Sequence, residues 1–186
     1  MASDPGHSYP AVLQEALARA LPRLHLAVLN RGIGGQDAPE ELARLQSDVI
    51  AVRPQVVIWQ VGANGALRNA DPAQFRSMVT DGVNQMRAAG IDVILMDNQH
   101  SPRVDAAPEH AVINETLAQV AAATGVSLFP RSLLMEEWGA EGAPVVEFVA
   151  TDGLHHNDHG YACVADTMAE EVVAALHETR ALSARR

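Results

Sequence analysis

The sequence has one cysteine and few basic residues. Cys163 is the only cysteine in the chain of 186 residues, which excludes an intramolecular disulfide and a cysteine-based zinc site. Lys and Arg number 13 against 23 Asp and Glu, which gives a formal net charge of −10. Because phosphate binding requires clustered Lys and Arg, this balance argues against a nucleic acid as the main partner.

The sequence also lacks long apolar runs and a leader pattern. A membrane-spanning helix needs roughly 20 apolar residues in a row. Every apolar run here is shorter, so we expect no membrane span. Residues 1–10 do not show the basic start and apolar stretch of a signal peptide. As written, the chain is expected in the cytoplasm; a natural start further upstream would allow a periplasmic or secreted location. The sequence indicates no oligomeric state.

Short apolar runs alternate with helical patterns along the whole chain. The apolar runs predict strands, and the periodic stretches between them predict helices. Strands are predicted at residues 24–29, 56–61, 91–96 and 126–129, and helices at 11–21, 37–52, 71–90 and 109–124, with a last helix from about residue 158. Residues 132–149 are expected to be irregular, with a short helix near 133–138. With no internal repeat or linker, residues 1–186 are predicted to form a single α/β domain with a parallel sheet.

Polar groups follow several of the predicted strands. In parallel sheets, the functional loops lie beyond the carboxyl ends of the strands. Gly35 has no Cβ, so its backbone N–H can approach a ligand closely. Asn64 offers a side-chain amide at the end of the 56–61 run. Two such donors can stabilise the oxyanion that forms when an ester carbonyl is attacked. The plainer interpretation, in which Gly35 makes a turn and Asn64 caps one, stays open.

A carboxylate and an imidazole stand three residues apart before the last predicted helix. Asp152 can fix one ring nitrogen of His155 and leave the other free to take a proton. Such a pair also occurs by chance in exposed loops. Metal binding through His155, His156 and His159 is an alternative, although their spacing matches no known site. No metal or other cofactor is expected.

Three segments together resemble conserved blocks of the SGNH (GDSL-type) hydrolases. Residues 30–35, Asn-Arg-Gly-Ile-Gly-Gly, resemble the block that ends in the oxyanion glycine. Residues 62–65, Gly-Ala-Asn-Gly, resemble the Gly-x-Asn-Asp block, with Gly65 in place of the usual Asp. Residues 152–157 resemble Asp-Gly-x-His-Pro-Asn, with His156 in place of Pro. The three blocks stand in the family's order over nearly the whole chain.

The resemblance implies a three-layer α/β/α fold of the SGNH-hydrolase or flavodoxin-like kind. It also implies a serine esterase or acetyl hydrolase that cleaves small acyl esters. His155 would then be the general base and Asp152 would orient it, while Gly35 and Asn64 would form the oxyanion hole.

The family's first block, a strand ending in Gly-Asp-Ser, has no counterpart in the sequence. In the family this strand lies between those matching residues 24–29 and 56–61, and its Ser is the nucleophile. Ser3 and Ser8 are the nearby hydroxyl candidates, but alignment with the family places both too far along the chain. We expect that the sequence begins inside a longer natural protein, rather than that it is a divergent four-stranded member. The alternative function is an inactive SGNH-fold protein that binds a ligand in the remaining pocket.

Overall fold

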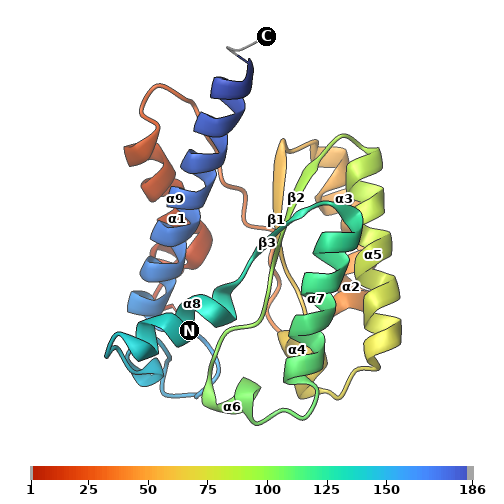
Figure 1. The fold of residues 1–186 in the computed structure, drawn as a ribbon, viewed down its shortest axis with the longest axis vertical. Coiled ribbons are helices and arrows are strands. Elements are labelled where there is room, and N and C mark those ends of the chain that lie inside the picture. Colours follow the sequence, from red (N-terminus) through yellow and green to blue (C-terminus); the bar gives the residue numbers. More distant parts are fainter. Residues whose placement is uncertain (1, 184–186) are drawn as a thin grey trace. The chain divides into compact units, whose positions relative to one another are not determined.

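The structure is a computed structural model that describes residues 2–183, with side chains as far as residue 176. The chain divides into two compact parts, Arg31–Val145 and Met1–Asn30 together with Val146–Arg186. The sheet lies in the first part, and two long helices pair in the second (Figure 1). The single domain over residues 1–186 stays a prediction.

A three-stranded parallel sheet forms the centre of the Arg31–Val145 part. Its strands are β1 (Val56–Gln60), β2 (Asp92–Met96) and β3 (Ser127–Phe129), in the order β1-β2-β3. Val56 pairs with Asp92, and Ile94 pairs with Ser127. The predicted α/β fold with a parallel sheet flanked by helices is therefore confirmed.

Seven helices accompany this sheet in the described part of the chain. They are α2 (Ala38–Ala43), α3 (Leu45–Asp48), α4 (Ala63–Leu67), α5 (Pro72–Ala88), α6 (Pro102–Asp105), α7 (His110–Thr124) and α8 (Arg131–Ala140). The predicted helix over residues 37–52 is interrupted, giving α2, α3 and the 3-10 turn η2 (Ile50–Val52). The short helix expected near 133–138 extends over all of α8, and η3 (Val145–Glu147) follows it.

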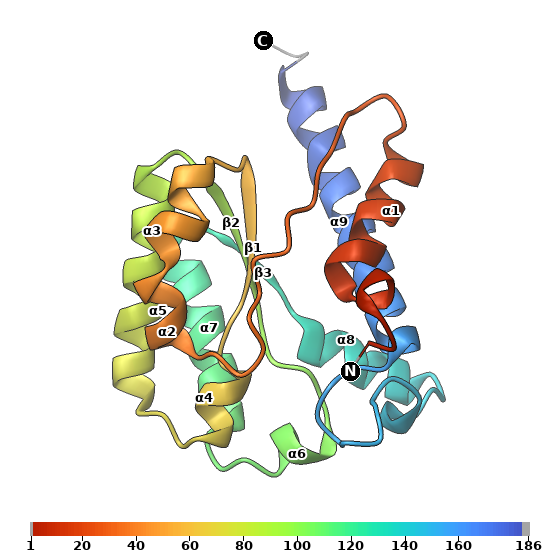
Figure 2. The ribbon, with the colours of Figure 1, turned by 180° about the vertical axis from the view of Figure 1, so that it is seen from behind.

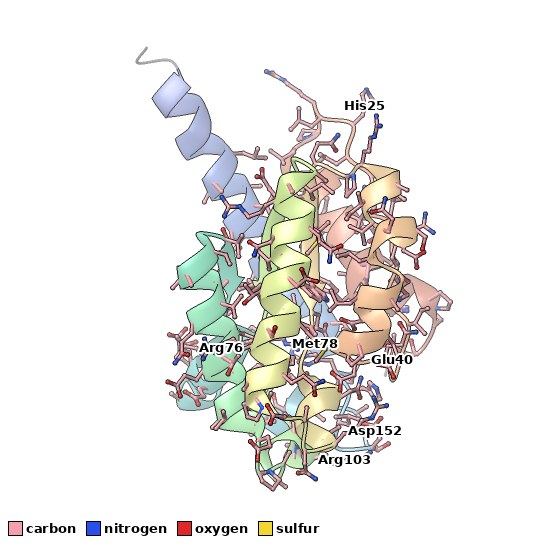
Figure 3. The ribbon with its side chains drawn as sticks, turned by 90° about the vertical axis from the view of Figure 1, so that its right-hand side faces the viewer. His25, Glu40, Arg76, Met78, Arg103 and Asp152 are labelled. Atoms are coloured by element: carbon pink, nitrogen blue, oxygen red, sulfur yellow. The ribbon has the colours of Figure 1, made fainter. Side chains whose placement is uncertain are left out.

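Two Asp residues stand at the first positions of the helices predicted over residues 37–52 and 71–90, and both cap a helix. The N–H of Gln74 donates to the Asp71 carboxylate at 2.8 Å, which caps α5. At α2, Asp37 and Glu40 form a reciprocal capping box, in which the Asp37 N–H donates to Glu40 at 3.0 Å. Glu40 is labelled in Figure 3. Each cap satisfies backbone donors that the first helical turn leaves without partners.

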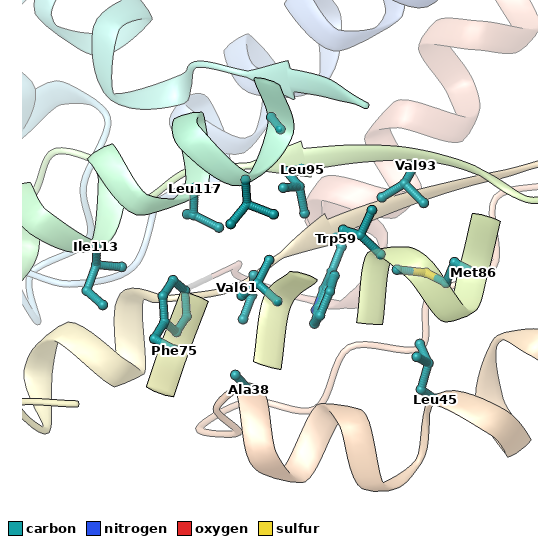
Figure 4. Packing of buried hydrophobic residues seen from close by; sticks show 14 of the residues in the cluster. Ala38, Leu45, Trp59, Val61, Phe75, Met86, Val93, Leu95, Ile113 and Leu117 are labelled. Carbon is teal, nitrogen blue, oxygen red and sulfur yellow. The ribbon is translucent and has the colours of Figure 1, made fainter. Parts of the chain in front are cut away.

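The main hydrophobic core lies between the sheet and the α2, α5 and α7 helices (Figure 4). Trp59 of β1, Phe75 of α5 and Leu117 of α7 are buried there. Gly82 allows the close contact between α5 and the sheet, because an added Cβ would stand 2.5 Å from the Trp59 ring. The Trp59 indole N–H donates to the Glu41 carboxylate at 2.7 Å, so the polar end of this core residue is satisfied.

The other part of the chain consists mainly of a helix pair. It contains η1 (Pro5–His7), α1 (Tyr9–Ala20) and α9 (Asp158–Ser183), and α1 packs along α9 (Figure 2). Leu13 and Leu17 of α1 are buried, and so are Ala165 and Met168 of α9. Their spacing of three and four residues places them on one face of each helix. No helix among the described residues is long and apolar enough to cross a membrane.

The prediction of a strand over residues 24–29 is wrong. The segment belongs to no β-ladder, and Leu26 and Leu29 are 37% and 58% exposed. Its backbone is bound instead by the side chain of Gln14 in α1, which donates to the Leu26 carbonyl at 3.1 Å and accepts from the Val28 N–H at 2.6 Å. An apolar run becomes a strand only when a neighbouring backbone offers a ladder. Here a side-chain amide provides the hydrogen bonds.

One edge of the sheet is open in the described residues. β1 pairs with β2 on one side, and no strand pairs with its other side. Val56 is 47% exposed, and Gln60 is exposed as well. Fully covered strands of parallel sheets are buried on both faces, so this exposure is typical of an edge strand.

Candidate functional site

The Asp152–His155 pair is built by a single tight loop. The Asp152 carboxylate accepts hydrogen bonds from the N–H groups of Leu154 and His155, at 2.9 Å and 3.0 Å. The same carboxylate lies 2.6 Å from Nδ1 of the His155 ring. Gly153 adopts a left-handed conformation with φ of 67°, which glycine reaches without strain and which lets the chain turn back so sharply.

The hydrogen bonds decide which ring nitrogen of His155 is available. Since Asp152 accepts at Nδ1, this nitrogen carries the proton, and Nε2 is the atom that can take another. The hydrogen bond from His155 and those from the two backbone N–H groups hold the pKa of Asp152 well below its usual range. The carboxylate therefore stays ionised at neutral pH. Both side chains are partly exposed, at 40% for His155 and 38% for Asp152, so solvent reaches the pair.

The flanking residues close this loop on itself. The Ala150 N–H donates to the His155 carbonyl at 2.8 Å, and Val149 forms an isolated antiparallel bridge with His156. His156 is only 2% exposed, and its Nδ1 donates to the Phe148 carbonyl at 3.2 Å. The residue that replaces the family's Pro is thus a buried packing residue that holds the loop.

The three histidines considered for a metal site have separate partners. His155 is bound to Asp152, and His156 is bound to the Phe148 backbone. The His159 ring stacks on the Phe148 ring with centroids 5.1 Å apart. Among the residues that the structure describes, no group of three or more His, Cys, Asp and Glu side chains is placed to hold a metal ion.

Neither serine near the N-terminus is paired with His155. The Ser3 hydroxyl donates to Asp158 at 2.6 Å, and the Ser8 hydroxyl donates to the Pro5 carbonyl at 2.7 Å. Within the described chain, no hydrogen bond joins either hydroxyl to His155. Ser3 also lies 3.4 Å from Nδ1 of His7, but that nitrogen already faces Asp4 at 2.8 Å. One nitrogen cannot both donate to a carboxylate and accept a serine proton. This group therefore does not form a second triad.

The other two predicted site residues lie together in the Arg31–Val145 part. Gly35 has φ of 82°, and its carbonyl accepts a hydrogen bond from Arg68 at 2.7 Å. The Asn64 side-chain amide donates to the carbonyl of Gln36 at 2.7 Å. That bond uses one N–H of the amide and leaves the second for another acceptor. No residue of the described chain accepts from the Gly35 N–H.

Asn64 is placed by the first turn of α4. Residues 63–65 of the Gly-x-Asn-Asp-like block are the start of this short helix, and Gly62 precedes it with φ of 118°. An added Cβ at Gly62 would stand 2.8 Å from the Ile113 side chain. Glycine is therefore required there both for its conformation and for the contact with α7.

Gly65, which replaces the family's usual Asp, lies beside the carboxylate of another residue. Gly65 is buried, and a Cβ added there would meet the two carboxylate oxygens of Asp37 at 3.1 Å and 3.4 Å. Asp37 is itself buried, and it accepts the N–H of Ala38 at 2.8 Å. A carboxylate therefore lies at this position of the loop, but it comes from the start of α2 rather than from residue 65.

Sequence reasoning missed two arginines that hold the Gly35 loop. Arg68 binds the Gly35 carbonyl, as described above. Arg44 donates to the Gln36 side chain at 2.7 Å and to the Arg31 carbonyl at 2.6 Å. Arg68 is 33 residues from Gly35, and Arg44 is 8 and 13 residues from its two partners. No local pattern relates residues at such separations, so the sequence carried no signal for them.

The polar loop after β2 turns inward. The N–H and hydroxyl of Ser132 donate to the Asp97 carboxylate at 2.9 Å and 2.6 Å. Burial raises the pKa of Asp97. Arg131 is 2% exposed and donates to the Asp97 carbonyl and to the Gln99 side chain. His100 is less buried and lies between the carboxylates of two acidic residues, Asp105 at 3.0 Å and Glu136 at 2.9 Å. Much of this loop thus serves the fold rather than a ligand.

Two esterases of known name are similar to the chain in sequence. Esterase TesA of Pseudomonas aeruginosa is 30% identical over 99 residues, which are 53% of this chain and 48% of that protein. The chain thus matches about half the length of that relative. An arylesterase of Vibrio mimicus is 24% identical over 166 residues, covering 89% of this chain and 78% of the relative.

Solved structures of esterases have the same fold. The acetylxylan esterase Axe2 of Geobacillus stearothermophilus is 20% identical, with a TM-score of 0.78 over 89% of this chain and 80% of that one. A lipase/acylhydrolase of Enterococcus faecalis is 25% identical, with a TM-score of 0.74 over 88% and 86%. These findings confirm the resemblance to SGNH hydrolases. The Non-GDSL lipase-like family model matches residues 1–178, so the chain belongs to that family.

Proposed function

We propose that the protein is an SGNH-type serine esterase that cleaves small acyl esters. The observation that carries the proposal is the 2.6 Å hydrogen bond between Asp152 and Nδ1 of His155, which leaves Nε2 free as a base. The proposed oxyanion donors are the Gly35 N–H, which has no acceptor in the described chain, and the second N–H of the Asn64 amide. The relatedness to esterases agrees with this chemistry.

In the proposed reaction, His155 removes the proton from a serine hydroxyl as its oxygen bonds to the ester carbonyl carbon. The negative charge that develops on the carbonyl oxygen is stabilised by the Gly35 N–H and the Asn64 amide. The imidazolium then returns the proton to the departing alkoxide, which leaves as an alcohol. Water attacks the acyl-enzyme by the same route and releases the acid. Asp152 stays ionised throughout and keeps the proton on Nδ1.

The substrate we propose is an ester with a short acyl group such as acetyl. The loops after the strands are short, which suits a small group, and Axe2 is named as an acetylxylan esterase. We also propose that the nucleophile is a serine. Ser3 and Ser8 are the candidates within this sequence.

The proposal is tested by the hydrolysis of p-nitrophenyl acetate. Wild-type protein is compared with His155→Ala, Ser3→Ala and Ser8→Ala, and with His25→Ala as a control on an exposed histidine. We expect His155→Ala to lose most of the activity, and His25→Ala to retain it. Loss with one serine variant identifies the nucleophile.

A second candidate function follows from the serine geometry, because both hydroxyls are bound to groups other than His155. The protein would then be an inactive member that binds a ligand. Wild-type protein without activity above buffer would favour this function and refute the esterase.

A further inference from the structure

Gly35 is held in place by hydrogen bonds rather than by packing. Apart from its two neighbours in the chain, no residue has an atom within 4 Å of the position that a Cβ would take at Gly35, so side-chain packing does not restrain the residue on that side. Glycine also loses more conformational freedom on ordering than any other residue. An N–H donor on such a residue keeps its direction only if the adjoining peptides are fixed.

Two side chains from the α4 region bind the two peptides that follow Gly35 in the chain. Asn64, in the first turn of α4, donates to the Gln36 carbonyl at 2.7 Å. Arg68, the residue that follows α4, donates to the Gly35 carbonyl at 2.7 Å. Consecutive carbonyls of the loop are thus bound by residues one helical turn apart. The Gly35 backbone is thereby tied to the helix that carries Asn64.

The Arg68 contact is suited to set geometry rather than to stabilise the fold. Its side chain is exposed, and exposed polar contacts contribute little to the free energy of unfolding. The guanidinium donates in a fixed planar arrangement, so it constrains direction better than a flexible ammonium. Among the described residues, it has no other hydrogen-bond partner.

We propose that Arg68 is a positioning residue for ester hydrolysis. Its guanidinium holds the Gly35 carbonyl and thereby restrains the Gly35 backbone, so that the Gly35 N–H and the Asn64 amide act together on one carbonyl oxygen. This inference rests on the proposed function. Arg68 itself touches no reacting atom in it.

The kinetic test compares Arg68→Met and Arg68→Lys with wild type on p-nitrophenyl acetate. Arg76→Met serves as the matched control, because Arg76 is an exposed arginine on α5 whose guanidinium binds Gln119 (Figure 3). Removing a whole oxyanion donor typically lowers kcat about 10²–10³-fold, so misplacing one is expected to lower it about 10-fold or more. We expect Arg68→Met to lower kcat by that factor with KM nearly unchanged. Arg68→Lys should restore part of the loss, and Arg76→Met should match wild type.

A second readout does not depend on activity. We expect the backbone amide order parameter of Gly35, measured by NMR relaxation, to fall from about 0.85 towards 0.6 in Arg68→Met and to stay unchanged in Arg76→Met. An active wild type with unchanged kcat in Arg68→Met would refute the positioning role alone. If wild type is inactive, the esterase proposal fails by itself. Unchanged Gly35 mobility in Arg68→Met would then overturn the Arg68 inference separately.

Discussion

The Asp152–His155 pair and the Gly35–Asn64 pair are built in different ways. Asp152 binds both the backbone and the ring of His155 within four consecutive residues. The Gly35 loop is held near Asn64 by two long-range hydrogen bonds. Asn64 binds the Gln36 carbonyl, 28 positions away, and Arg68 binds the Gly35 carbonyl, 33 positions away. The first pair is therefore held by contacts within one loop, whereas the second pair depends on the folded arrangement of α2 and α4.

The largest effect of a substitution is expected at the Asp152–His155 pair. Asp152→Asn removes the carboxylate that keeps the proton on Nδ1 of His155, so the imidazole can adopt the wrong tautomer. We expect kcat for p-nitrophenyl acetate to fall about 10²–10⁴-fold. The melting temperature should change little, because both side chains are partly exposed.

The control for this prediction is Asp81→Asn. Asp81 is an exposed carboxylate on α5 that accepts from Gln85 at 2.8 Å. A loss of activity as large in Asp81→Asn would show that general charge, rather than the pairing with His155, determines the rate.

A smaller effect, on stability, is expected at Gly65, the residue next to Asn64. Gly65→Asp places a second carboxylate against that of Asp37, with the new Cβ 3.1 Å from an Asp37 oxygen. We expect this variant to lose about 1–3 kcal/mol of unfolding free energy, measured by urea denaturation. Adding Asp37→Asn should recover part of the loss, because one of the two charges is then gone.

Gly139→Asp is the matched control for this substitution, since no atom lies within 4 Å of an added Cβ at that position in α8. If Gly65→Asp is no more destabilising than Gly139→Asp, the carboxylate of Asp37 does not restrict position 65. The long-range contact between α2 and α4 would then not determine which residue is tolerated next to Asn64.

The smallest effect is expected for the hydrogen bonds between Gln14 and the 24–29 segment. These bonds lie in the same part of the chain as the Asp152–His155 pair. Gln14→Met removes the hydrogen bonds to Leu26 and Val28 while keeping a similar side-chain length. We expect a loss of about 1–2 kcal/mol, seen as a melting temperature about 2–8 °C lower. Gln85→Met, on the exposed face of α5, should change the melting temperature much less. Equal shifts in the two variants would show that Gln14 does not hold the 24–29 segment.

Local signals explain which elements could be predicted. The Asp71 and Asp37 caps and the β-branched run of β1 each depend on neighbours within a few residues, and the structure contains all of them. The 24–29 run has the same apolar character but forms no strand. Whether an apolar run forms a strand depends on whether another strand lies beside it to pair with, and the run's own residues do not determine this.

The α/β class, the parallel strands and the pairing of Asp152 with His155 could be predicted from the sequence, because hydrophobic periodicity, helix caps and a four-residue loop are local properties. Three other features depend on the tertiary structure: Arg68 and Asn64 hold the Gly35 loop, Asp37 lies in the space beside Gly65, and Gln14 binds the segment after α1. Each of these contacts joins side chains to backbone far along the chain. Their geometry is fixed by how the helices pack, and no spacing in the sequence encodes it.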